Sequence, residues 1–418
     1  MIVCIEALNY KCLKYIRQDI GQFQVLVGPN ASGKSTFLDV ISLIGDLLME
    51  GPEYAVDARA SRSTRVDELT WQGTGNRIEL AVEMRVPEHL GQKDRQHAIC
   101  RYEVAIGNTE EDPETRVLAE TLLLLPERSV PPHTQRALFP VEPEAPETIL
   151  IGARKQKPGS RAVVKKIEES GNDYFRSETS GWNTQFRFGP TKAALANLPE
   201  DEHKFPVATW AKRFLIGGIV PLALNSAVMR QPAPRSKGWG LDLDGSNLPS
   251  VIKRLQKRPD QFKLWIEHVR TALPDLENLR TRERPQDRSV YLTAVFRNNL
   301  RIPSWLVSEG TLRLLALTII AYIEPLYFMY LIEEPENGIH PKALEAVFQS
   351  LSSAYESQVM VATHSPVFLR LAKPEQVLCF AKTPEGATDI VRGSEHPRLR
   401  DWRGEVDLAD FFAAGVLG

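Results

Sequence analysis

Residues 23–36, FQVLVGPNASGKST, combine glycine, lysine and serine at a spacing suited to holding phosphate groups. An apolar run typical of a strand comes first, then the pattern Gly-x-x-x-x-Gly-Lys-Ser, then a helical pattern. Glycines let backbone N–H groups surround phosphate oxygens, and the N-terminus of the following helix favours the same negative charge. We therefore expect phosphate binding by Gly28, Pro29, Asn30, Ala31, Ser32, Gly33, Lys34, Ser35 and Thr36.

Two side chains of this loop have specific expected roles. Lys34 is placed to bridge the β and γ phosphates of ATP, and the Ser35 hydroxyl is placed to bind Mg²⁺. The alternative is a glycine turn that binds nothing. The flanking strand and helix argue against it, because they supply the setting that the phosphate loop requires.

A second stretch, 328–341, reads FMYLIEEPENGIHP, and its apolar run leads directly into Glu333 and Glu334. Acids at the carboxyl end of a buried strand lie where open α/β sheets bind their ligands. We expect Glu333 to hold Mg²⁺ and Glu334 to polarise or deprotonate the attacking water. The alternative interpretation is a charged helix start that follows a core strand.

Two further stretches place polar residues at element ends. Residues 359–368, VMVATHSPVF, form an apolar run that ends at His364, followed by a helix-start pair. A lone histidine is usually structural, but its position one strand after Glu334 favours a catalytic role for His364. Residues 307–315, VSEGTLRLL, put Ser308 and Gly310 ahead of an apolar helical run.

Together these motifs resemble the ATP-binding-cassette (ABC) ATPase heads of the RecF/SMC/OLD type. They occur here in the order Walker A (28–36), signature (308–313), Walker B (328–334), D-loop (336–340) and switch histidine (364). The resemblance implies that Ser308 and Gly310 reach the γ-phosphate of ATP bound to a second subunit. It also implies that His364 senses that phosphate, that Lys34, Glu334 and His364 support hydrolysis, and that ATP and Mg²⁺ join a head-to-tail dimer, or a higher oligomer.

Three features depart from the family pattern. The first Walker B acid is Glu333 where aspartate is usual, so its reach to Mg²⁺ differs by one methylene. The signature is the reduced Ser-Glu-Gly form, which favours RecF/OLD-type heads over transporter domains. The Q-loop is hard to place, and Gln72 is the best candidate.

The expected fold class is α/β: an ABC-type P-loop ATPase head with an antiparallel β subdomain and an inserted helical lobe. Recurrent prolines between Thr36 and Ser308 exclude a long coiled-coil arm. We expect an N-terminal ATPase lobe (1–125), an inserted Pro-rich loop and helical lobe (126–300), and a C-terminal ATPase lobe (301–418). Strands are expected at 77–86, 101–106, 120–125 and 376–381, with a hairpin continuing to 391, and helices at 191–198, 201–216, 244–252 and 259–273. Residues 407–417 read as a closing core helix or a docking helix.

The composition is that of an ordinary globular protein, with 43% apolar and 25% charged residues in 418. The net charge of −2 is unevenly spread, because residues 151–303 hold 27 Lys and Arg against 15 Asp and Glu. This basic segment is either a nucleic-acid surface or ordinary solvated surface, and its charges are dispersed along the chain. Four cysteines without a C-x-x-C pair argue against zinc sites and disulfides.

Localisation and partners follow from the same observations. We expect no signal peptide and no membrane span, since Glu324-Pro325 divides the apolar run 314–332. A reducing cytoplasm is expected. Only 54 residues follow His364, too few for the nuclease domain of OLD proteins, so we expect a separately encoded effector.

The resemblance favours one function over two alternatives. We expect an ATP-driven dimeric switch that acts as the sensor of a bacterial anti-phage system and controls an effector from a neighbouring gene, such as a nuclease. The first alternative is a RecF-like DNA-repair ATPase that binds DNA through the basic segment. The second is a scaffold in which ATP holds an oligomer together with little turnover.

Overall fold

The structure is a computed structural model of the chain, and most of the residues are described. The described residues are 1–57, 59, 62–90, 97–109, 112–127, 136–152, 159–168, 170–234, 240–323, 328–399 and 408. The expected break at Glu324-Pro325 lies outside them, as does the expected helix 407–417 apart from Leu408. Within the described part, no helix combines the length and apolarity needed to cross a bilayer.

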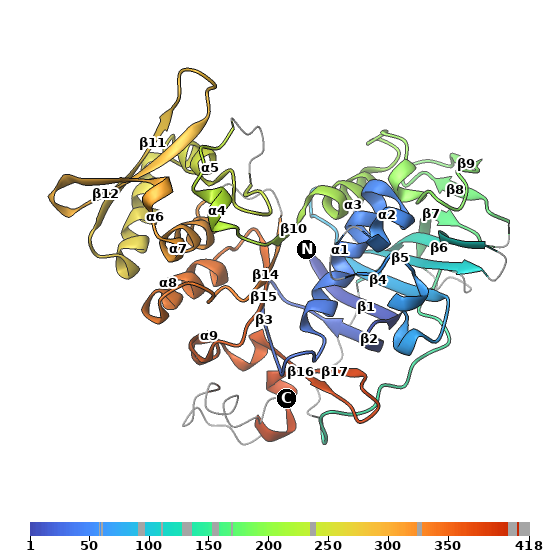
Figure 1. Cartoon of the computed structure of the whole chain (residues 1–418). Coiled ribbons are helices and arrows are strands. Elements are labelled where there is room, and N and C mark those ends of the chain that lie inside the picture. Colours follow the sequence, from blue (N-terminus) through green and yellow to red (C-terminus); the bar gives the residue numbers. More distant parts are fainter. Residues whose placement is uncertain are drawn as a thin grey trace.

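A six-stranded sheet forms the centre of the molecule, in the order β10-β14-β15-β3-β16-β17 (Figure 1). Neighbouring strands are parallel except for the β16–β17 hairpin. The expected strands 23–27 and 376–381, and the hairpin after the latter, are confirmed. The strand bounds are β3 Phe23–Val27, β10 Ile219–Leu222, β14 Met329–Glu333, β15 Gln358–Ala362, β16 Val377–Lys382 and β17 Thr388–Arg392.

The parallel strands bring three motifs to one edge of this sheet. β3 lies beside β15, which lies beside β14, and the register pairs Leu26 with Ala362 and Ala362 with Glu333. The phosphate loop follows β3, Glu333 ends β14, and His364 comes two residues after β15. Because carboxyl ends of parallel strands share an edge, these segments become neighbours, although Ser35 and Glu333 are 298 positions apart in the sequence.

Side chains of the central sheet alternate between two cores. On β3, Val25 and Val27 belong to one apolar cluster and Leu26 belongs to the other. The first cluster joins the sheet to helices α7 (Glu309–Ile319), α8 (Pro341–Ser352) and α9 (Pro366–Leu371). The second joins it to α1 (Lys34–Glu50) and to the antiparallel sheet. Both faces are buried, which explains why these strands read as continuous apolar runs.

The antiparallel subdomain is an eight-stranded sheet, ordered β2-β1-β4-β5-β6-β7-β8-β9, on the right of Figure 1. The expected strand 77–86 is confirmed as β4, which ends one residue earlier, and the expected strands 101–106 and 120–125 are confirmed within longer strands. The sheet continues through β7–β9, which we expected to belong to the inserted segment. The bounds are β1 Ile2–Tyr10, β2 Leu13–Asp19, β4 Arg77–Arg85, β5 Ile99–Thr109, β6 Asp112–Leu125, β7 Arg161–Lys166, β8 Asp173–Arg176 and β9 Asn183–Phe186.

Two expected helices differ from the structure, and in each case a buried carboxylate accepts hydrogen bonds from backbone N–H groups of the segment. Glu120 accepts from the N–H of Ala194 (2.5 Å) and of Leu195 (2.9 Å), and only the 3₁₀ turn Leu195–Asn197 forms in place of helix 191–198. The second helix is α3, Pro206–Gly217, which starts five residues later than expected. Its first turn donates to the carboxylate of Glu178, and proline suits its first position.

The remaining helices divide between the two sides of the central sheet. α2 (Pro52–Asp57) and α3 pack beside α1 on the side of the antiparallel sheet. α4 (Ser226–Met229), α5 (Leu248–Leu255) and α6 (Pro259–Ala272) lie on the other side, with a three-stranded sheet of β11 (Leu276–Glu283), β12 (Val290–Phe296) and β13 (Leu300–Pro303) (Figure 1). The helices of the expected inserted segment (126–300) therefore do not form one lobe, because α3 lies on the side opposite to α4, α5 and α6.

Candidate nucleotide-binding site

The phosphate loop joins β3 to α1, as its sequence pattern predicts. Gly33 has φ +101°, and a Cβ atom there would collide with the side chain of Thr388. A Cβ atom on Gly28 would collide with the carbonyl oxygen of Phe380. The two glycines thus let the loop pack closely against the β16–β17 hairpin, and the side of the loop away from the hairpin is left for a ligand. The Ser32 hydroxyl is buried in this loop and has no hydrogen-bond partner among the described residues.

Lys34 is buried at the start of α1, and its ammonium group closes back on the loop. Its Nζ donates hydrogen bonds to the carbonyl oxygens of Gly28 (2.7 Å) and Pro29 (2.8 Å). Burial lowers the pKa of Lys34, and the nearby carboxylates of Glu333 and Glu334 oppose this effect. In the structure the ammonium group donates to carbonyl oxygens, and a bound phosphate would place a negative charge directly against it, so the loop fits an anion.

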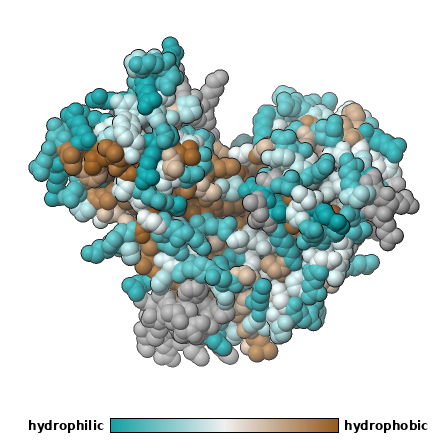
Figure 2. Space-filling view, viewed as in Figure 1, coloured by the Kyte–Doolittle hydropathy of each residue, from teal (hydrophilic) through white to brown (hydrophobic). Residues whose placement is uncertain are grey.

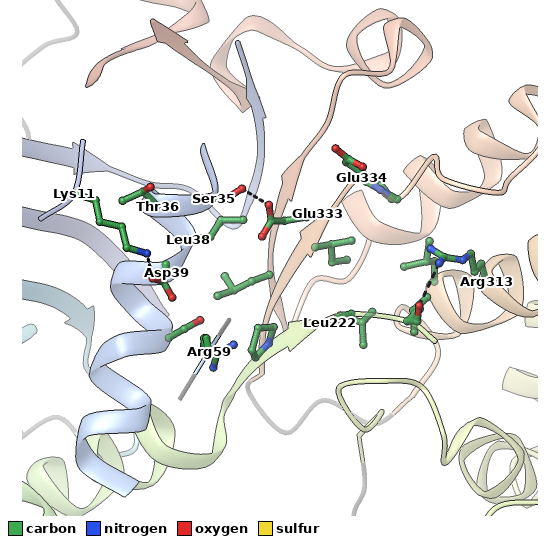
Figure 3. Close-up of a pocket in the computed structure, with 18 residues that line it drawn as sticks. Lys11, Ser35, Thr36, Leu38, Asp39, Arg59, Leu222, Arg313, Glu333 and Glu334 are labelled. Atoms are coloured by element: carbon green, nitrogen blue, oxygen red, sulfur yellow. Dashed lines mark hydrogen bonds and ion pairs between the residues drawn. The ribbon is translucent and has the colours of Figure 1, made fainter. Parts of the chain in front are cut away.

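Ser35 and Glu333 meet across the edge of the central sheet. The hydroxyl of Ser35, in the first turn of α1, donates a hydrogen bond to the Oε2 atom of Glu333 at the end of β14 (Figure 3). A hydroxyl oxygen and a carboxylate oxygen are ligands that suit Mg²⁺. No cluster of three metal-ligating side chains occurs in the described part of the chain. The pair therefore fits a magnesium ion that takes its other ligands from phosphate and water.

Glu334 is held by its backbone and by a side-chain partner. Its φ of +47° is a left-handed conformation, and its N–H donates to the Ala362 carbonyl oxygen (2.8 Å). Its carboxylate oxygen Oε2 accepts a hydrogen bond from Nδ2 of Asn337 (2.5 Å). A strained backbone persists only where the surroundings determine it. The backbone conformation of Glu334 and the hydrogen bond from Asn337 therefore both orient its carboxylate. Asn337 is a site residue that the sequence pattern did not single out.

Glu336, the first residue of the D-loop, fixes the segment that carries His364. Its carboxylate accepts hydrogen bonds from Oγ1 of Thr363 (2.8 Å) and from the backbone N–H of His364 (2.9 Å). Thr363 is fully buried, whereas His364 is partly exposed. The D-loop thus forms hydrogen bonds with Glu334 through Asn337, and with Thr363 and His364 through Glu336.

The signature segment begins α7, as the small polar residues before the apolar run predict. The Ser308 side chain caps the helix by accepting from the N–H of Thr311 (3.3 Å). A Cβ atom on Gly310 would collide with the carbonyl oxygen of Gly338 in the D-loop of the same chain. A contact within the same chain, between Gly310 and the D-loop backbone, therefore explains why a glycine is needed at this position. Ser308 is exposed at the helix N-terminus.

A cavity of about 550 Å³ lies beside Ser35, Glu333 and Glu334 (Figure 3). α1 contributes the polar side chains of one wall and β10 contributes Leu222, while Arg313 reaches it from α7. Neither Ser308 nor Gly310 lines this cavity. Within the chain, the signature helix therefore contributes a side chain to the cavity but not the two residues expected to contact γ-phosphate.

A buried ionic cluster supports the α1 wall of the cavity, and the sequence patterns did not identify it. Asp39 accepts hydrogen bonds from Tyr10 (2.5 Å), Lys11 (3.0 Å) and Arg62 (2.7 Å). Burial alone would raise the pKa of Asp39, but the hydrogen bonds and charge of Arg62, together with the charge of Lys11, lower it. Arg62 has a fully buried side chain and also pairs with Asp46 (2.8 Å). The cluster ties α1 to the β1–β2 turn.

Gln72, the candidate Q-loop residue, lies in a short 3₁₀ turn at 71–73 and is exposed. Its side chain donates to the backbone carbonyl oxygen of Glu385 (3.4 Å). Gln72 does not line the cavity beside Ser35 and Glu333. Its assignment as the Q-loop stays a prediction.

The comparisons with known proteins agree with this geometry. Residues 23–370 match the family model described as "AAA domain, putative AbiEii toxin, Type IV TA system". The chain belongs to this AAA-domain family. The matched residues run from β3 to α9 and so contain every motif of the site. The recognition of a RecF/SMC-like ABC-type ATPase from the sequence is confirmed at the level of the ATPase family.

Solved structures that resemble this AAA-domain chain include heads of SMC proteins. An SMC head bound to the C-terminal winged-helix domain of ScpA has 15% identity and a TM-score of 0.49, with 93% of this chain and 96% of that chain covered. The SMC head domain from Thermotoga maritima has 10% identity and a TM-score of 0.44, with coverage of 94% and 98%. A search of curated proteins found no significant match.

Proposed function

We propose that this chain hydrolyses ATP and uses the bound nucleotide to form a head-to-tail dimer. The observation that carries the proposal is the hydrogen bond between Ser35 and Glu333, beside Lys34. It brings a phosphate loop and an acidic strand end, nearly 300 residues apart in sequence, into one candidate site for a magnesium nucleotide. Mg²⁺ bound there would neutralise phosphate charge during transfer.

Each residue of the site has a proposed role that its position supports. The loop amides and Lys34 would hold phosphate, while Ser35 and Glu333 would hold Mg²⁺. Glu334, whose carboxylate direction is fixed by Asn337, would orient or deprotonate the attacking water. His364 would sense the γ-phosphate from the segment that Glu336 positions.

Ser308 and Gly310 would act on nucleotide bound to a second subunit. Ser308 is exposed at the N-terminus of α7, where the helix dipole favours an anion. Two composite sites would then hold two ATP molecules between two copies.

We further propose that the dimer controls a separately encoded effector in antiviral defence. The description of the matched family names a putative AbiEii toxin and a type IV toxin–antitoxin system, and this wording supports the proposal. The effector would be a nuclease or toxin from a neighbouring gene. A neighbouring gene without either activity, or an effector that ignores the ATP state, would count against this role.

The test measures steady-state ATP hydrolysis and molecular mass in solution, with Mg²⁺, for wild type, Lys34→Ala and Glu334→Gln. We expect Lys34→Ala to lose nucleotide binding, and Glu334→Gln to bind ATP, hydrolyse it at least tenfold more slowly and double in mass. A Glu334→Gln variant that binds ATP but remains monomeric would refute the contact in trans. ATP-dependent dimers without measurable turnover in wild type would support a scaffold instead.

A further inference from the structure

The three-stranded sheet β11–β13 has one covered face and one open face. Its covered face packs on α5 and α6 and carries Leu279, Leu292 and Ala294, all at most 1% exposed. Gln256, the residue that follows α5, forms hydrogen bonds with Leu279 and Thr281 of β11 on this side. The opposite face meets no other secondary-structure element of comparable extent in the described part of the chain. Figure 1 shows the β11–β12 hairpin projecting from the body of the molecule.

The open face is rich in arginine. Arg280 and Arg282 alternate with inward-facing residues of β11, and the register places them opposite Thr293 and Tyr291. Arg301 of β13 lies opposite Val295 on the same face. All three arginines are exposed. Since residues two apart on a strand are separated by roughly 6.7 Å, the charges of Arg280 and Arg282 lie close together. Arg301 lies on the same face, two strands away.

The row of arginines continues into the hairpin turn. The N–H of Arg284 donates to the Ser289 carbonyl oxygen (2.8 Å), which extends the pairing by one step beyond β11. Arg288 follows in the same turn, and both residues are exposed. The hairpin therefore presents positive charge along its length and at its tip.

The nearby carboxylates do not neutralise these charges. Glu283 points to the covered face and pairs with Lys253 of α5 (2.5 Å). Asp287 accepts from the N–H and hydroxyl of Ser289, and Asp275 pairs with Arg297 at the far end of the sheet. Among the described residues, neither Arg280 nor Arg282 is in a salt bridge. Like charges on one strand face repel, so the arrangement favours an external anion.

Two aromatic rings lie beside the arginines. Tyr291 on β12 contacts Trp305, whose ring centroid is 5.6 Å away. Trp305 follows β13 and is 46% exposed. Arginine offers a planar, bidentate match to phosphate, and exposed aromatic rings offer stacking surfaces for bases. The strands of this sheet carry arginine and no lysine, and the arginine fork suits bidentate contacts with phosphate.

We propose that the open face of β11–β13 binds the phosphate backbone of a nucleic acid, through Arg280, Arg282 and Arg301. Arg280 and Arg282 lie along β11, and Arg301 lies two strands away on the same face, so the three cations can contact several phosphates of one backbone. None of these residues lines the cavity beside Ser35 and Glu333. The inference therefore stands apart from the proposed ATP-dependent dimer and goes beyond it.

The experiment measures fluorescence anisotropy of a labelled 30-base-pair duplex, and of a single strand of the same length, without nucleotide at several salt concentrations. The variant is R280A/R282A/R301A. The control is R65A/R85A/R213A, which removes the same charge from exposed arginines elsewhere. We expect the face variant to lose at least tenfold in affinity and to have a salt slope smaller by about two to three, because each phosphate contact contributes about one.

Three results would overturn the proposal. They are absence of binding by the wild type to either probe, equal losses in the face variant and the control, and displacement of the duplex by polyglutamate at equal charge concentration. The last result would assign the face to acidic proteins. Thermal unfolding of each variant verifies that the exposed substitutions leave the fold intact. Lys34→Ala should bind DNA like the wild type, so failure of the ATP proposal would not affect this measurement.

Discussion

Gly310 of the signature segment lies directly against Gly338 of the D-loop in the same chain. The carbonyl oxygen of Gly338 is well under 3.0 Å from the position that a Cβ atom on Gly310 would occupy. The D-loop also carries Asn337 and Glu336, which position Glu334 and the His364 segment. A displacement at the signature helix must therefore reach the residues proposed to hydrolyse the chain's own ATP. Under the dimer proposal, this contact couples the two composite sites.

Gly310→Ala tests this contact. The added methyl group must displace the D-loop backbone, at a cost of about 1–3 kcal/mol in the free energy of unfolding. We expect ATP hydrolysis to fall at least tenfold, measured with nucleotide binding as a separate readout. Gly217→Ala is the matched control, because nothing lies within 4 Å of a Cβ at that helical position. Equal activity of the two variants would show that the D-loop tolerates the shift.

Asn337→Ala tests the positioning of Glu334. Loss of the 2.5 Å hydrogen bond frees the carboxylate to rotate, so the hydrolysis rate should fall while the ATP dissociation constant changes little. Asn337→Asp should be worse, because it places a second negative charge against Glu334. The exposed Asn183 on β9 provides a control substitution, Asn183→Ala. A parallel loss of binding and turnover would instead indicate general damage to the site.

Glu333→Asp tests the proposed metal position. The shorter side chain withdraws the carboxylate by one methylene from the Ser35 hydroxyl, with which it is hydrogen-bonded in the structure. We expect the Mg²⁺ concentration for half-maximal hydrolysis to rise several-fold, and Glu333→Gln to raise it further. Titrations of Mg²⁺ at fixed ATP measure both effects. An unchanged requirement in both variants would remove Glu333 from the metal site.

Asp39→Asn tests the ionic cluster through its pH dependence. The pKa of Asp39 is lowered in the folded protein, so its charge stabilises the fold above the unfolded value of about 3.9. That contribution is lost as pH falls through the lower folded pKa. Wild type should therefore be more stable than the variant at pH 7, and the difference in free energy of unfolding should shrink below about pH 4. A difference that stays constant down to pH 3 would mean the effect is steric.

Much of the site was predictable because its motifs are local. A strand, a glycine loop and a helix start are read within fourteen residues, and the structure places Ser35 beside Glu333 as their separate motifs implied. The helix expected at 191–198 failed for a non-local reason. Its backbone N–H groups are taken by Glu120, which lies over 70 positions earlier on β6. Helix propensity, which depends on the local sequence, takes no account of a hydrogen-bond acceptor from a distant part of the chain.

Sequence alone determined the order and identity of the motifs, since each depends on residue types at fixed short spacings. Tertiary structure decided which distant residues meet them: Thr388 beneath the phosphate loop, Arg62 on Asp39, and Gly338 against Gly310. It also decided where the charges of the basic segment lie in space. Its charges are dispersed along the chain, yet strand pairing gathers Arg280, Arg282 and Arg301 on one face. The physical reason is that strand order and register, which set these distances, arise from packing of the whole chain.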